Sequence, residues 1–203
     1  MFKEKLNKRF YTTLVENKLE TPTPLQEQGL PKINSGGDVI FVAPEGSGKS
    51  TLVSIASIHK LQRAIDDVPK VLILAGSNET GKTLLEQLKS FTRGTDLRVN
   101  AAFEDGKIDA QNAEIYEGTD ILIGTPKRLL DLYFASSINL NKLKLFVMDD
   151  PELMIKHSWQ GQVDRLTSSL PKCQHLVFTT ELNEKVEKLI HKFMVAPYLI
   201  EIE

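Results

Sequence analysis

The sequence predicts an α/β fold in which helices cover both faces of a mostly parallel β-sheet. The first observation is an alternation, from residue 38 onwards, of short and nearly continuous apolar segments with helix-like segments. Parallel strands that are buried on both faces have this composition, and helices connect them. The second is a glycine-rich turn at residues 43–50, between one such strand and a helix. The third is composition, because 41% hydrophobic and 26% charged residues in a chain of 203 are typical of a soluble globular protein.

The first 35 residues are predicted to form two helices ahead of the sheet. Prolines at positions 22 and 24 separate them, because proline forces an extended or turning path. The second helix is short and ends near Leu30, and the glycines at 36 and 37 turn the chain into the first strand. The first helix spans residues 3–17 and carries apolar side chains at helical spacing: Leu6, Phe10, Tyr11, Leu14 and Val15.

Strands and helices are then predicted in alternation. The strands are residues 38–42, 71–75, 97–103, 120–123, 143–148, 175–179 and 198–202. The helices are residues 49–58, 79–92, 109–116, 126–134, 160–170 and 183–193. We predict one domain over residues 1–203, with the N-terminal helices in residues 1–35 and the sheet core in residues 36–203. Ligands of such sheets bind beyond the carboxyl ends of the strands, so the functional site is expected at that edge.

Composition and charge argue against several classes of protein. The net charge of −2 offers no overall basic field for nucleic acid, so any such binding needs a local patch. No apolar run reaches membrane-spanning length, and the first residues do not form a signal peptide. The four histidines lack metal-ligand spacing, which argues against a catalytic zinc. Cys173 is the only cysteine, and we expect it to be buried at the start of a strand in a protein of the reducing cytoplasm.

The glycine-rich turn has the pattern of a phosphate-binding loop, because it lies between a strand and a helix. Gly46 and Gly48 leave the backbone free to aim its N–H groups at one anion, and the following helix adds the positive end of its dipole. Lys49 would reach the outer phosphates, and the Ser50 hydroxyl would bind Mg²⁺. Ala43 stands where the strict pattern has a glycine, and a purely structural turn is the alternative. The residues expected to contact the nucleotide here are Pro44, Glu45, Gly46, Ser47, Gly48, Lys49, Ser50 and Thr51.

An acidic pair follows one of the predicted strands. Asp149 lies at the carboxyl end of this strand and would hold Mg²⁺ together with Ser50. The alternative role is the N-cap of the next helix, with Pro151 as an early helical residue. Asp150 would orient or deprotonate an attacking water. Asp150 and Lys49 are therefore the candidate catalytic residues.

Taken in order, these motifs resemble the first RecA-like domain of DEAD-box RNA helicases, over essentially the whole chain. The phosphate loop of that family also begins with alanine. Residues 21–26 resemble the family's adenine-reading Q motif, which implies that Gln26 binds the adenine and that Leu19 takes the family's apolar position of the same site. Phe2 lies near the place of the aromatic residue that stacks on the base. The resemblance thus implies ATP and Mg²⁺ as cofactors.

RNA is the partner that the resemblance implies. Residues 123–128 are similar to the family's Thr-Pro-Gly-Arg segment, which grips the RNA backbone, and residues 76–79 replace Pro-Thr-Arg-Glu, a segment that faces RNA. Glu104 and Asp105 lie where the family has paired glycines, and these acids are unfavourable for an approaching RNA phosphate. The implied RNA-binding residues are Ser77, Asn78, Thr125, Pro126, Lys127 and Arg128.

Two further motifs depart from the family pattern. Residues 149–152 are Asp-Asp-Pro-Glu in place of Asp-Glu-Ala-Asp, so the expected general base is one methylene shorter. A misplacement of about 1 Å in such a group costs roughly 100-fold in rate. Residues 179–181 are Thr-Thr-Glu in place of Ser-Ala-Thr, which in the family couples hydrolysis to strand separation. A bond between Glu152 and Thr179 would retain part of that coupling.

The sequence therefore predicts the ATP-binding domain of a DEAD-box-like RNA helicase, with weak or no hydrolysis as an isolated domain. The family's second RecA-like domain is not within these 203 residues, and we expect it in a longer parent chain or in a separate protein. The alternative is a degenerate module that binds ATP, RNA or a protein without hydrolysis. A small-molecule kinase is disfavoured, because it has no use for both the Gln26 segment and residues 125–128.

Overall fold

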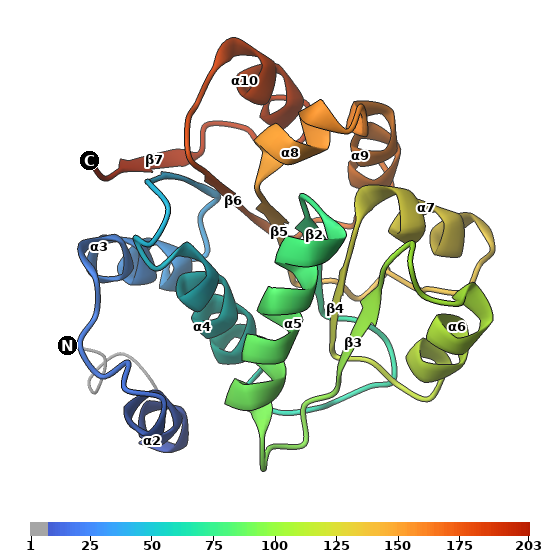
Figure 1. Cartoon of the computed structure of the whole chain (residues 1–203), viewed down its shortest axis with the longest axis horizontal. Coiled ribbons are helices and arrows are strands. Elements are labelled where there is room, and N and C mark those ends of the chain that lie inside the picture. The colour runs from blue at the N-terminus through green and yellow to red at the C-terminus, as the bar shows by residue number, and fades with distance from the viewer. Residues whose placement is uncertain (1–7) are drawn as a thin grey trace.

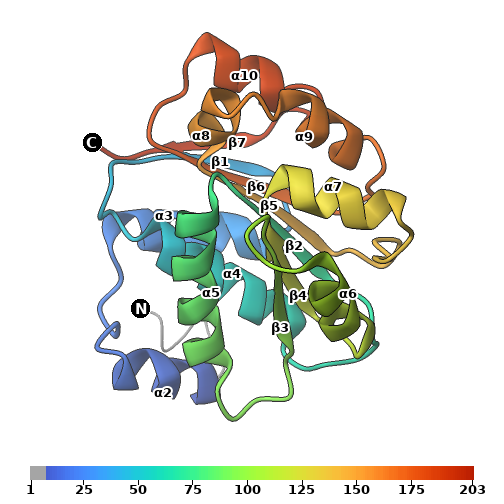
Figure 2. The same cartoon turned by 45° about the vertical axis from the view of Figure 1, so that its right-hand side comes forward.

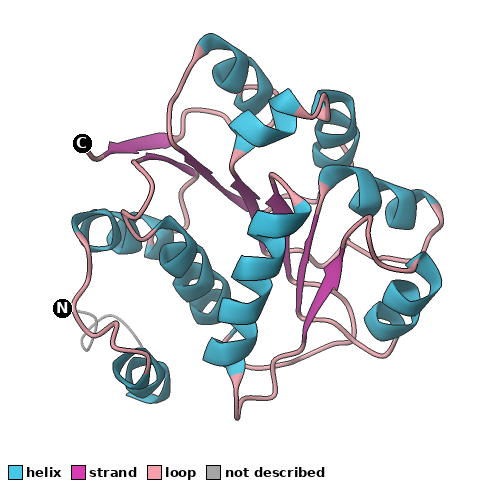
Figure 3. Ribbon diagram, viewed as in Figure 1, coloured by secondary structure: helices cyan, strands magenta, loops and turns pink. Residues whose placement is uncertain are grey.

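A central β-sheet organises the fold, as Figures 1 and 3 show. The computed structural model describes residues 8–203. Within this part of the chain, seven strands form one sheet, and every neighbouring pair of strands is parallel. The order across the sheet is β3-β4-β2-β5-β6-β1-β7. The strands are β1 (Val39–Val42), β2 (Val71–Ala75), β3 (Val99–Ala102), β4 (Ile121–Gly124), β5 (Leu145–Asp149), β6 (Gln174–Thr179) and β7 (Tyr198–Glu201).

Helices cover both faces of the sheet, which confirms the predicted fold class (Figure 2). One face carries α2 (Lys8–Glu16), α3 (Pro24–Asn34), α4 (Lys49–Leu61) and α5 (Asn78–Thr92). The other face carries α6 (Ile108–Tyr116), α7 (Pro126–Phe134), α8 (Pro151–Lys156), α9 (Gln160–Thr167) and α10 (Glu184–Ile190).

Alternate side chains of each inner strand enter two separate hydrophobic cores. In β2, Val71 and Ile73 pack under α3–α5, whereas Leu72 and Leu74 pack under the helices of the opposite face. This alternation follows from the two-residue period of a strand. Phe41 of β1 and Phe178 of β6 stack with their ring centroids 4.6 Å apart in the first core. Because both faces are buried, the inner strands are mostly apolar, and their polar residues lie towards the strand ends, as Gln174, His175 and Thr179 do in β6 and Asp149 does in β5.

Helix α3 is longer than predicted. It continues past Leu30 and through Pro31 to Asn34. A proline inside a helix removes one backbone hydrogen bond, so the sequence favoured an earlier end. Leu30 and Ile33 are both buried against the first core, and this burial keeps the last turn in place.

Two other expectations are wrong, and a third concerns residues that the structure does not describe. The sequence predicts that Cys173 is buried at the start of a strand. It lies instead one residue before β6, at the amino edge of the sheet beside His175, and is therefore only half-buried. Val15 of α2 is exposed, whereas Leu14 is fully buried. The placements of Phe2 and Leu6, and of the side chain of Phe10, lie outside the described residues.

Among residues 8–203, no helix has the length and apolar character needed to cross a bilayer.

Candidate functional site

The phosphate-binding loop joins the carboxyl end of β1 to the start of α4, as the sequence predicts. Gly48 is the residue before α4 and has a left-handed backbone, with φ of 93°. A larger residue at Gly48 would be strained by this conformation, and its Cβ would lie 2.5 Å from Nε2 of Gln26 and so displace that amide. The helix therefore begins with its free N–H groups directed at the loop, which is the geometry of an anion site.

Lys49 folds back over this loop. Its Nζ donates hydrogen bonds to the carbonyl oxygens of Ala43, at 2.6 Å, and of Pro44, at 3.1 Å. The side chain is 8% exposed, so its charge acts in surroundings that screen it weakly. The ammonium group thus lies at the loop without a carboxylate in hydrogen-bonding contact among the described residues.

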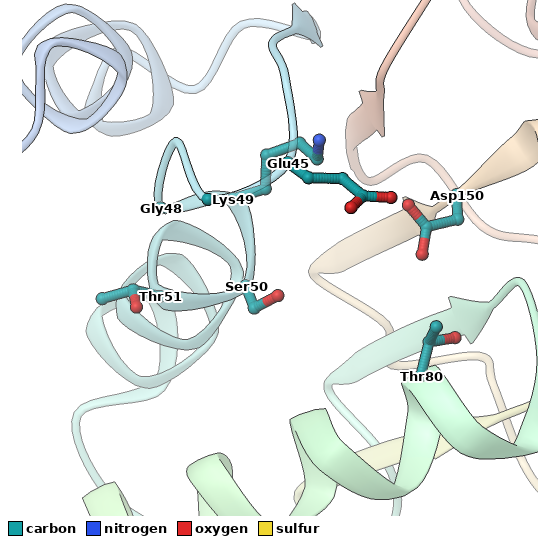
Figure 4. Close-up of a pocket in the computed structure, with 8 residues that line it drawn as sticks. Glu45, Gly48, Lys49, Ser50, Thr51, Thr80 and Asp150 are labelled. Carbon is teal, nitrogen blue, oxygen red and sulfur yellow. The ribbon is translucent and has the colours of Figure 1, made fainter.

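A pocket of about 390 Å³ opens beside the loop, and Figure 4 shows the side chains around it. Ser50 is exposed at this pocket, whereas the Thr51 hydroxyl accepts a hydrogen bond from Nε2 of Gln87 at 3.1 Å. Thr80, in the first turn of α5, is a lining residue that sequence reasoning missed; its only signal was a position just beyond the carboxyl end of β2. The lining comprises Glu45, Gly46, Gly48, Lys49, Ser50, Thr51, Thr80 and Asp150.

The acidic pair lies at the end of β5, and Asp150 is the member of the pair that lines this pocket. Asp149 ends the strand and is 5% exposed, and its pKa is raised, first by burial and then by the charge of Asp150. Lys49 acts in the opposite direction and lowers that pKa. The first residue of α8 is Pro151, and the residue before it is Asp150, whose side chain makes no capping hydrogen bond. The alternative role of Asp149 as a helix N-cap is therefore wrong.

Asp150 is held in a strained position at the pocket. Its backbone is left-handed, with φ of 58° and ψ of 60°. The chain passes so close to Gly76 that a Cβ there would lie 2.7 Å from the carbonyl oxygen of Asp150. Burial raises the pKa of Asp150, and the charges of Glu152 and Glu45 raise it further. Figure 4 shows the Glu45 and Asp150 carboxylates pointing toward one another, so two like charges meet where the phosphates are expected.

The segment around Gln26 is hydrogen-bonded to the glycine-rich loop. Thr23 and Gln26 form a capping box at the start of α3. The same two side chains donate to the loop, Oγ1 of Thr23 to the Ser47 carbonyl at 2.8 Å and Nε2 of Gln26 to the Gly48 carbonyl at 3.2 Å. Leu19 is half-buried against the first core. The predicted roles of Gln26 and Leu19 in binding adenine stay predictions.

Glu152 makes the contact that its motif suggests. Its carboxylate accepts hydrogen bonds from Oγ1 of Thr179, at 3.0 Å, and from the backbone N–H of Thr180, at 2.9 Å. The Thr180 hydroxyl adds a third, at 2.6 Å. The end of β6 is therefore tied to α8 although residues 179–181 differ from the family pattern.

The predicted RNA-binding residues lie at the ends of β2 and β4, outside the lining of the pocket. Ser77 caps α5 by accepting a hydrogen bond from the backbone N–H of Thr80, and Oδ1 of Asn78 is buried without a partner in the described part of the chain. Thr125 and Pro126 are buried, Lys127 is exposed, and Arg128 is half-buried. The structure thus divides the predicted site residues between two neighbouring parts of one sheet edge.

The parallel sheet, the glycine-rich loop after β1 and the acidic pair at the end of β5, two strands away in the sheet, define an α/β protein of the RecA-like class. The family model of DEAD/DEAH box helicases matches residues 23–189. The chain belongs to the DEAD/DEAH box helicase family.

Curated relatives agree with this assignment. The chain is 33% identical over 199 residues to the pre-mRNA-processing ATP-dependent RNA helicase PRP5 of Meyerozyma guilliermondii, with 91% of this chain and 23% of the relative covered. It is 27% identical over 186 residues to the ATP-dependent RNA helicase DeaD of Escherichia coli, with 91% and 29% covered. The chain therefore spans less than a third of the length of these curated relatives.

Two solved structures share the fold. A DEAD box protein from the hyperthermophile Methanococcus jannaschii superposes with a TM-score of 0.92 at 21% identity, over 98% of this chain and 54% of that chain. The yeast DEAD-box splicing factor Prp28 gives a TM-score of 0.91 at 23% identity, over 98% and 50% of the two chains.

Proposed function

We propose that this chain is the ATP- and Mg²⁺-binding domain of a DEAD-box RNA helicase, and that a second RecA-like domain completes its active site. The observation that carries the proposal is the meeting of the Lys49 loop with the Asp149–Asp150 pair at one edge of the sheet. A loop of backbone N–H groups and one lysine suits a triphosphate, and an adjacent carboxylate suits its metal ion.

Mg²⁺ suits the oxygen donors at the pocket and just beside it. It prefers oxygen ligands, and the Ser50 hydroxyl and the Asp149 carboxylate are the candidates to hold it, directly or through water. Burial raises the pKa of both Asp149 and Asp150, and neighbouring acids raise it further, whereas Lys49 lowers it, so these carboxylates repel other negative charges in the pocket. A divalent cation would neutralise this repulsion and shield the phosphates when bound.

Catalysis depends on Asp150 and on groups from outside the chain. Asp150 reaches the pocket that would hold the terminal phosphate, where it would orient or deprotonate a water. Its side chain is one methylene shorter than the family's glutamate, so we expect slow hydrolysis. RNA would bind beside this pocket through residues at the ends of β2 and β4, and strand separation would require the second domain.

The direct test is equilibrium binding of fluorescent ATP, ADP and GTP analogues to the chain, with Mg²⁺ and with EDTA. We expect adenine-selective, Mg²⁺-dependent binding, weakened about 100-fold or more in Lys49→Ala, because the ammonium contact with the phosphates is lost. Gln26→Ala should abolish the preference for adenine.

Lys89→Ala is the matched control, because it removes an exposed lysine at the far end of α5. It should leave ATP affinity unchanged. A folded Lys49→Ala variant with wild-type affinity for ATP would refute the site.

A further inference from the structure

The loop after β3 places an acidic side chain on the predicted RNA-binding segment. β3 and β4 are neighbours in the sheet, so Glu104, just beyond β3, lies next to Thr125, just beyond β4. We propose that the Glu104 carboxylate occupies the position of an RNA phosphate at the start of α7 and so determines how tightly the chain binds RNA. This inference rests on the proposed function and deepens its RNA-binding part.

The first support is the contact with Thr125. Its Oγ1 donates to Oε2 of Glu104 at 2.6 Å, a short bond of the charge-assisted kind. Thr125 is fully buried, so RNA meets the Glu104 side chain before it meets this hydroxyl. A hydroxyl has one hydrogen to donate, and here the carboxylate accepts it.

The second support is the position at the start of a helix. Thr125 is the N-cap of α7, and its side chain caps no backbone N–H group. The positive end of a helix attracts an anion, whether a carboxylate or a phosphate. Glu104 is thus bonded at the place where this edge of the sheet would receive a phosphate of the RNA backbone.

Arg128 keeps the loop in this position. Its guanidinium donates to the backbone carbonyls of Glu104, at 3.0 Å, and Gly106, at 3.3 Å, and to Oε1 of Gln111, at 3.0 Å. These acceptors are neutral, so the charge of Arg128 remains available to attract a phosphate. Lys127 beside it is exposed and adds a second positive charge. The segment therefore combines cations that favour RNA with a carboxylate that opposes it.

Only one of the two oxygens of the Glu104 carboxylate has a hydrogen-bond partner among the described residues, so an RNA phosphate can displace this carboxylate. Oε1 of Glu104 is buried and has no hydrogen-bond partner among the described residues. A buried charged oxygen without a partner costs free energy, so releasing it to solvent returns part of what the Thr125 contact contributes. Asp105 differs from its neighbour, because it forms an ion pair with Lys82. Glu104 is therefore the acid of this loop that competes with RNA.

The test compares RNA affinity in Glu104→Gln and in the wild-type chain. A fluorescent single-stranded oligouridylate is titrated, with an ATP analogue and Mg²⁺ present, at several salt concentrations. Glutamine keeps the size of the side chain and removes its charge. We expect about tenfold tighter binding, because a like charge beside a phosphate is removed. We also expect a salt dependence that is steeper by about one phosphate contact.

Asp109→Asn is the control for net charge. It removes one exposed carboxylate from the first turn of α6 and should change RNA affinity by less than about twofold. Glu104→Ala gives a second variant with the same expected direction, and thermal unfolding checks that each protein is folded.

The outcomes separate the inference from the proposed function. If the wild-type chain binds RNA and neither Glu104 variant binds it more tightly, the competition is refuted and RNA binding stands. If no variant binds RNA at low salt although all bind ATP, the RNA-binding part of the proposed function fails and this inference fails with it.

Discussion

The two edges of the sheet carry charges in opposite ways. At the amino ends of the strands, acidic and basic side chains are matched in ion pairs. At the carboxyl ends of the same strands, carboxylates face one another and Lys49 faces carbonyl oxygens. All strands are parallel, so each edge gathers side chains from distant parts of the sequence.

At the amino edge, buried ion pairs and hydrogen bonds stabilise the fold. Asp120 is 1% exposed, and its carboxylate accepts bonds from the backbone N–H and the guanidinium of Arg98. Asp38 holds both the backbone N–H of His175, at 2.7 Å, and its imidazole, at 3.0 Å. Lys70 is 3% exposed and pairs with Asp66 at 2.8 Å.

The carboxyl edge carries buried acids that repel one another. Asp149 and Asp150 have raised pKa values because they are buried near other acids, and Asp150 also has a strained backbone. Such an arrangement opposes folding in the absence of a cation or a phosphate-bound metal. Buried ion pairs therefore stabilise the amino edge, whereas the buried acids at the carboxyl edge repel one another and are only partly offset by Lys49, at the place where the nucleotide is proposed to bind.

The largest effect on stability is expected at the amino edge. Asp120→Ala should lower the free energy of unfolding by about 3 kcal/mol, because Arg98 and its backbone N–H lose a buried partner. Asp67 is the matched control: it also bonds Arg98, but its side chain is 80% exposed, so Asp67→Ala should cost less than about 1 kcal/mol. Urea denaturation of both variants gives the comparison. Equal losses would contradict the distinction between buried and exposed pairs.

A smaller effect on the free energy of unfolding is expected from the pH-dependent protonation of His175. Burial lowers its pKa, but the hydrogen bonds to Asp38 and Cys173 raise it by more, so the pKa is about 9 instead of 6.5. The folded state therefore binds a proton more tightly than the unfolded state. This contribution is complete below pH 6.5 and is lost as the pH rises through 9. After allowance for solvent screening, we expect about 1–2 kcal/mol.

The measurement is urea denaturation between pH 6 and pH 10, for the wild type and for Asp38→Asn. Asparagine keeps an oxygen for the backbone N–H of His175 but lacks the charge that favours the imidazolium. The stability difference between the two proteins should shrink towards high pH. A difference that is constant over this range would show that the pair acts only as a neutral hydrogen bond.

The smallest effect, and of opposite sign, is expected at the carboxyl edge. Asp150→Asn should stabilise the ligand-free chain by about 1 kcal/mol in EDTA, after discounting for solvent screening, because it removes a carboxylate that burial and Glu152 disfavour. Its pKa is raised from 3.8 to about 6, so the gain should appear above pH 6 and vanish below pH 4. Asp109→Asn serves again as the control. A loss of stability in Asp150→Asn would mean that this edge is not under electrostatic strain.

Sequence reasoning succeeded where the signal is local. The glycine-rich loop between β1 and α4 could be placed because its glycines, lysine and serine lie within one turn, and its role in binding phosphate stays a prediction. The alternation of strands and helices follows from hydrophobic patterns that are each a few residues long. The prediction ends helix α3 too early, because Pro31 in the sequence favours a helix end. The helix continues because Ile33 is buried against the rest of the fold, which the local sequence does not show.

Most contacts between distant residues, unlike the Glu152–Thr179 bond suggested by its motif, were decided by the tertiary structure alone. Glu104 is 21 residues from Thr125 and meets it because β3 and β4 are neighbours. Asp38 meets His175 across 137 residues because β1 pairs with β6. The order of strands in a parallel sheet is set by how helices pack on its faces, and no short stretch of sequence specifies that packing. The sequence by itself therefore determined the class of fold and the position of the glycine-rich loop between β1 and α4, while the arrangement of charges at both edges arose only when the strands assembled.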